Sequence, residues 1–142
     1  MILRSEVVRE RLRLLEETVA ELKRQPAGTA EELRRDVPRR WILERGLIAG
    51  ANLVFDVTDH VLAGHFEVHP ETYEQALLEL QARSVISREL YAELEGLGGL
   101  RNVLVHLYAR IDPAHIAEHH RKAPPVFRQF AVEVMGWLDR LG

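Results

Sequence analysis

Apolar residues recur every three to four positions along most of this chain, which is the spacing of one face of an α-helix. The clearest stripe consists of Val8, Leu12, Leu15, Val19 and Leu22. It predicts a helix over residues 3–24 that ends at the QPAG segment. No segment alternates apolar and polar residues over a useful length, so no strand is predicted. The pattern predicts an all-α fold, an up-and-down bundle of four main helices with short extra helices, in a single domain spanning 1–142.

The starts of the next helices are indicated by capping residues and prolines. Thr29, with an acidic residue three positions later, forms a capping box for a short helix. Pro38 suits the first turn of a long helix that ends near Ala63. Pro70 is expected to open a further helix through about Arg83.

The second half of the chain shows similar signals. The GHFEVHP segment is expected to be a loop, and Ser87 to cap the helix that follows. A long helix is expected to end near Arg110, and Asp112 with Pro113 marks a further helix start. The last helix is striped by Phe127, Phe130, Val134, Trp137 and Leu141.

Three glycines precede residues 101–108, the segment with most of the candidate catalytic residues. Gly96, Gly98 and Gly99 either end a helix or allow another backbone or a phosphate to approach closely. A continuous helix with close packing is the favoured prediction.

Composition narrows the class of protein. With 46% hydrophobic and 29% charged residues, the chain is typical of a globular domain. It has no cysteine, so disulfides and thiolate metal sites are excluded. Its N-terminus is too charged for a secretory signal, and no apolar stretch approaches the roughly 18 residues of a membrane span. A cytoplasmic location without membrane contact is expected.

The net charge of −3 is unevenly distributed. Residues 101–128 hold five Arg and Lys against two Asp and Glu, and four of the seven histidines. This segment therefore carries +3 and the rest of the chain −6. If the protein binds a polyanion, residues 101–128 are the segment expected to contact it.

The segment RNVLVHLY, residues 101–108, combines an apolar face with an unusual polar one. At about 100° per residue, two leucines and Val103 share one arc of a helical wheel. Arg101, Asn102, His106 and Tyr108 lie on the other side. A merely solvated face more usually carries Glu and Lys.

This polar set suits phosphodiester chemistry without a metal. His106 can take or give the proton of a ribose 2′-hydroxyl or of a leaving oxygen. Arg101 can hold the non-bridging oxygens and stabilise the transition state. One histidine cannot conveniently act as both base and acid, but two copies facing each other across a homodimer can. Tyr108 is expected either at the mouth of the cleft that holds Arg101 and His106, or in the core with its hydroxyl hydrogen-bonded within the protein.

Two further groups are weaker candidates. His115 and His119 have the i, i+4 spacing that can grip a metal, with Asp112 or Glu118 as a third ligand. A solvent-facing short helix rich in histidine explains them better, with a basic rim near a substrate groove as an intermediate alternative, so no metal is predicted. A polar stripe on the long second helix consists of Arg45, Asn52, Asp56 and Asp59. It is either a narrow solvent-exposed stripe on a central helix, or it lines a cleft and orients Arg101 and His106 through hydrogen bonds.

The arrangement R-x-x-x-x-H-x-Y in LRNVLVHLYARID resembles the signature of the HepT family, within the HEPN superfamily of small all-helical proteins. TAEELRRDVPRRWILERGLIAGANLVFDVTDHVLAG is similar to that family's first conserved helical block. HPETYEQALLELQARSVIS is similar to the segment that follows it. The resemblance covers roughly residues 29–112, and the three glycines depart from the family's pattern.

The resemblance implies a HEPN-like fold and a metal-independent endoribonuclease that needs no cofactor and acts on RNA as the toxin of a toxin–antitoxin pair. It implies that Arg101 and His106 are catalytic and that Asn102 supports them. It implies that Tyr108 receives AMP units from an MntA-like minimal nucleotidyltransferase, the antitoxin. The alternatives are a non-catalytic binding subunit of such a nucleotidyltransferase, or a purely structural dimerising bundle; the intact Arg101 and His106 favour the enzyme.

Overall fold

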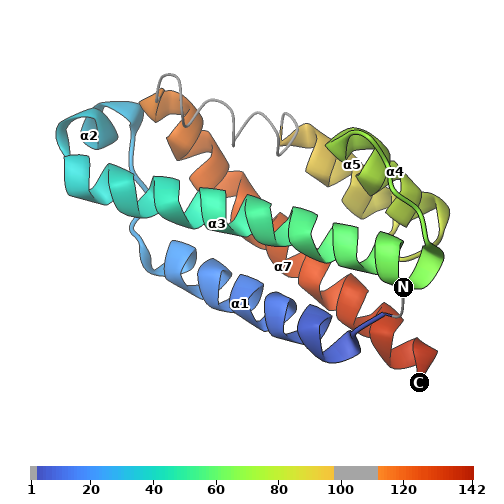
Figure 1. Cartoon of the computed structure of the whole chain (residues 1–142). Coiled ribbons are helices and arrows are strands. Elements are labelled where there is room, and N and C mark those ends of the chain that lie inside the picture. Colours follow the sequence, from blue (N-terminus) through green and yellow to red (C-terminus); the bar gives the residue numbers. More distant parts are fainter. Residues whose placement is uncertain (1–2, 98–111) are drawn as a thin grey trace.

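The protein is an all-α bundle built on three long helices (Figure 1). The computed structural model describes residues 3–97 and 112–142. The long helices α1 (Ser5–Arg24), α3 (Val37–Val61) and α7 (Pro113–Leu141) pack against one another. In Figure 1, α3 and α7 run in the same direction and α1 runs opposite to them. The predicted fold class is confirmed, while the part of the predicted main helix from residue 98 to its end near Arg110 lies outside the described residues.

The core lies between these three helices, and the shorter helices add buried residues to the same cluster, among them Leu33, Leu80 and Leu90. All five residues of the predicted α1 stripe are buried, which confirms that stripe. Each such aliphatic side chain contributes about 1.5 to 3 kcal/mol when it leaves water. None of the helices in the described ranges is long and apolar enough to cross a membrane.

The predicted helix caps are confirmed by their hydrogen bonds. The Thr29 hydroxyl accepts from the Glu32 backbone N–H at 3.2 Å and begins α2 (Ala30–Arg35). The Ser87 hydroxyl accepts from a backbone N–H at 3.1 Å and begins α5 (Arg88–Gly96). The Asp112 carboxylate does the same for α7, at 2.9 Å. Each cap satisfies an amide that has no partner within its own helix.

The predicted GHFEVHP loop is wrong in its first part. Residues Leu62–Phe66 extend α3 as a wider π-turn, η1. The rings of His65 and Phe66 lie 5.0 and 5.8 Å from the Trp137 ring of α7, measured between centroids. These contacts with a residue some seventy positions away favour the widened turn, and Glu67 then ends it in the left-handed conformation (φ 56°).

The helix predicted to open at Pro70 begins three residues later, as α4 (Tyr73–Ala82). The Thr72 hydroxyl accepts from the Gln75 backbone N–H at 3.1 Å. This side-chain cap satisfies an amide of the first turn, so α4 begins directly after Thr72 and Pro70 lies in the segment before it.

The histidine-rich segment and the last helix are one helix, α7, and not two. Pro124 and Pro125 lie inside it and cannot donate to the carbonyls one turn earlier. Pro124 is nevertheless buried, together with its neighbours Val126 and Phe127. Packing of this face against α1 and α3 offsets the lost hydrogen bonds.

The continuous, closely packed helix predicted across the glycines is wrong at its first glycine. Helix α5 ends at Gly96, and apart from its own turn of helix no described residue would lie within 4 Å of a methyl group added there. Gly98 and Gly99 lie outside the described residues.

Candidate functional site

The strongest site residues predicted from the sequence lie outside the described residues. These are Arg101, Asn102, His106 and Tyr108. The structure describes the elements on either side of their segment. These are α5, which ends at Gly96, and α7, which begins after the Asp112 cap. The remaining candidates lie on α1, α3 and α7 and can be placed.

The polar stripe of α3 lines two different hollows. Asn52, Asp56 and Asp59 line a small pocket of about 380 Å³, closed on one side by Tyr73 of α4. The Tyr73 ring packs on Phe55 with 3.9 Å between ring centroids. Arg45, two turns earlier, lines a separate groove between α3 and α1.

Asp56 is held by an ion pair with another helix. The Arg11 Nε of α1 donates to Asp56 Oδ2 at 2.5 Å, and His60 Nε2 lies 3.6 Å from the other carboxylate oxygen. The pair is about 40% exposed on both sides, so it contributes at most about 1 kcal/mol. Its clearer effect is to orient the carboxylate toward α1.

Asp59 lies one turn along α3 from Asp56. Partial burial raises the pKa of the Asp59 carboxyl, the charge of Asp56 raises it further, and His60 opposes both. The folded state therefore favours the protonated form, so this group lowers stability as the pH rises above the ordinary pKa of an aspartate. That Asp56 and Asp59 orient Arg101 and His106 stays a prediction.

The histidines of α7 and the two acidic residues considered with them make separate contacts. The His115 and His119 rings are stacked with 6.4 Å between centroids, and Asp112 Oδ2 lies 3.7 Å from His115 Nε2. Glu118 instead accepts from the Lys122 ammonium at 2.7 Å. Within residues 3–97 and 112–142, no three possible ligands converge on one point.

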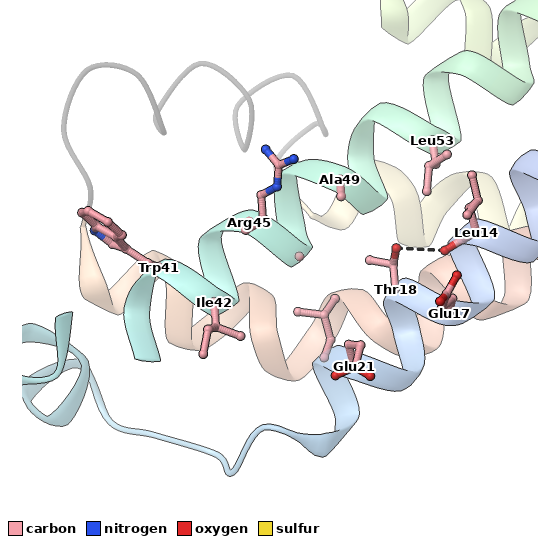
Figure 2. A pocket seen from close by; sticks show the side chains of 11 residues that line it. Leu14, Glu17, Thr18, Glu21, Trp41, Ile42, Arg45, Ala49 and Leu53 are labelled. Atoms are coloured by element: carbon pink, nitrogen blue, oxygen red, sulfur yellow. Dashed lines mark hydrogen bonds between the residues drawn. The ribbon is translucent and has the colours of Figure 1, made fainter. Parts of the chain in front are cut away.

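The sequence analysis missed an apolar groove between α1 and α3, of about 910 Å³ (Figure 2). Leu14 and Leu53 lie at one end of it and Trp41 and Ile42 at the other. The Trp41 side chain is 64% exposed. A signal for this groove was present, because three consecutive apolar residues in a helix, 41–43, cannot all face one core.

The comparisons with known proteins agree on one family. A family model described as HepT-like ribonuclease matches residues 9–134. The chain is also similar to a tRNA nuclease HepT from Aphanizomenon flos-aquae (strain 2012/KM1/D3). The two are 27% identical over 110 residues, which is 78% of this chain and 75% of that protein.

Proposed function

The chain belongs to the HepT-like ribonuclease family, and we propose that it is a metal-independent endoribonuclease acting on tRNA. The match over residues 9–134 carries the proposal, and it confirms the family and enzyme class predicted from the sequence. The RNVLVHLY segment falls inside the matched range. The name of the similar tRNA nuclease supports tRNA as the substrate class.

The proposed chemistry uses two copies of the segment. One His106 removes the proton of a ribose 2′-hydroxyl, which then attacks the adjacent phosphorus. The His106 of the second copy gives a proton to the 5′-oxygen as it leaves. Arg101 stabilises the charge that develops on the non-bridging oxygens, and Asn102 supports it.

A homodimer follows from this need for two histidines, and the described surface supports it. Trp41, Ile42 and Leu14 expose large apolar area along the groove between α1 and α3. Exposed apolar patches on a helical bundle of this size are commonly covered by a partner.

The experiment that tests the proposal is cleavage of purified tRNA in excess EDTA. We expect undiminished cleavage, because acid–base catalysis by His106 and charge stabilisation by Arg101 need no ion. Sedimentation of the same sample at micromolar concentration should give a dimer. Loss of cleavage in EDTA that zinc restores would overturn the metal-independent mechanism, and an active monomer would remove the composite site.

We further propose that the protein is the toxin of a toxin–antitoxin pair and that a minimal nucleotidyltransferase silences it by adding AMP to Tyr108. On a helical wheel Tyr108 lies within about 20° of Arg101. AMP at that phenol would place a phosphate beside the guanidinium, where it competes with the RNA phosphate. Modification then blocks cleavage by occupancy and leaves the bundle folded.

Tyr108→Phe tests this regulation. The variant should fold and cleave RNA at the wild-type rate, yet resist silencing by the nucleotidyltransferase with ATP, because it lacks the acceptor oxygen. Intact-mass measurement should show AMP on the wild type alone. A variant that still gains AMP and still loses activity would place the modified residue elsewhere.

A further inference from the structure

A pocket of about 620 Å³ lies where the C-terminal end of α1 and the loop after it meet α7. Helix α1 contributes Lys23, the loop contributes residues 25 and 27–29, and α7 contributes His120 and Arg121. Two prolines of α7 add an apolar wall. Among the residues that the structure describes, no aspartate or glutamate lines this pocket, so its charged groups there are all basic or imidazole.

Hydrogen bonds between distant segments fix the walls of the pocket. His120 Nε2 lies 2.7 Å from the Leu22 carbonyl oxygen and ties α7 to the last turn of α1. From α3, Arg39 Nη2 donates to the carbonyls of Pro26 and Ala27 at 2.5 and 2.8 Å. The loop is therefore held in place before any ligand arrives, which lowers the entropy lost on binding.

The pocket has two cationic side chains, Lys23 and Arg121, that can bind an anion. Their sequence neighbours are neutralised within their own helices, Arg24 by Glu21 and Lys122 by Glu118. In the part of the chain that the structure describes, Lys23 and Arg121 take part in no ion pair, and both are exposed. An anion bound here meets no competing carboxylate from these described residues.

The position of the pocket relates it to the proposed ribonuclease. Arg121 comes nine residues after the Asp112 cap, or about 13 Å along α7. Asp112 directly follows the segment that carries Arg101 and His106. An RNA strand bound at Arg121 thus lies about 13 Å along α7 from the residue at which that segment joins the helix.

We infer that the Lys23–Arg121 pocket binds backbone phosphates of the RNA substrate, outside the residues that cut it. Lys23 and Arg121 contact non-bridging phosphate oxygens, and such contacts hold the strand in register without reading its sequence. The inference rests on the proposed function, because it takes RNA as the ligand.

The test compares single substitutions that remove the same charge in different places. Arg121→Gln and Lys23→Gln alter the pocket. Arg140→Gln is the matched control, since Arg140 is also exposed and lies near the opposite end of α7. Binding is measured with a labelled single-stranded RNA of about 16 nucleotides, 2′-O-methylated so that 2′-hydroxyl attack cannot occur. Cleavage of tRNA is measured separately.

We expect each pocket variant to bind the RNA about fivefold more weakly. The slope of log Kd against log salt should fall by about 0.7 for each phosphate that the protein no longer neutralises, between about 50 and 200 mM salt. KM for tRNA should rise while kcat stays constant, because the pocket holds RNA away from the reacting atoms. Arg140→Gln should match the wild type in each measurement.

The outcomes separate this inference from the proposed function. Equal weakening by Arg121→Gln and Arg140→Gln would show a general charge effect and overturn the pocket. Wild-type affinity in both pocket variants would also overturn it, even with tRNA cleavage intact. The wild-type protein could also fail to cleave RNA while the pocket variants bind RNA more weakly than it does. That result would support the pocket and refute the proposed ribonuclease activity.

Discussion

Replacing His106 with alanine is expected to lower the rate of tRNA cleavage by about 10²- to 10⁴-fold. The imidazole both removes the proton from the attacking 2′-hydroxyl and, in the second copy, supplies one to the leaving oxygen. Alanine can do neither, and water is a poorly positioned substitute. Arg101→Ala should lower the rate by about 10²- to 10³-fold, because it removes the charge that stabilises the transition state.

The measurement is single-turnover cleavage of purified tRNA, with His69→Ala as the control. His69 is an exposed histidine between η1 and α4 and has no role in the proposed chemistry. The control variant should cleave like the wild type. Circular dichroism melting curves should coincide for all variants. A His106→Ala protein that is folded and fully active would refute the assignment of the catalytic residue.

Gly50→Val is expected to lower the free energy of unfolding by about 3 kcal/mol. At Gly50, α3 approaches α7 so closely that an added Cβ would overlap the Cε2 atom of Phe127. Phe127 is only 1% exposed, so its ring has no open space to enter. The two helices must separate or the ring must leave its rotamer, and valine's branch makes both worse.

Urea denaturation provides the measurement, and Gly96→Ala the control. Gly96 is also a helical glycine, but no described residue of another element lies within 4 Å of an added methyl group, so alanine there should be neutral or stabilise by up to about 1 kcal/mol. Adding Phe127→Leu to Gly50→Val should recover part of the loss, since the two positions contact each other. A Gly50→Val protein as stable as the wild type would contradict the close approach of α3 and α7.

Both predictions concern features that the sequence shows to different degrees. The RNVLVHLY segment is visible as a motif, because the chemistry proposed for it depends on residue types at a fixed spacing in the sequence. The contact of Gly50 with Phe127 is not visible, because it depends on which faces of two distant helices meet. A glycine at position 50 gives no sign by itself that a ring lies against it.

The sequence by itself determined the helical class, the α1 stripe and the caps at Thr29, Ser87 and Asp112. Caps form between residues within one helical turn, and a stripe buries itself whatever surface it meets, so neither needs knowledge of the partner. The basic character of the segment that contains Arg121 was likewise a matter of residue types.

Only the tertiary structure decided the π-turn of η1, the continuity of α7 and the pocket beside Lys23. The π-turn is stabilised by Trp137, and the pocket by the contacts of His120 with Leu22 and of Arg39 with the loop before α2. Helix α7 continues through its prolines because the core covers that face. In each case the local sequence favours a loop or a helix end, and contacts between residues far apart in the chain outweigh that preference. Such contacts exist only once the helices have packed.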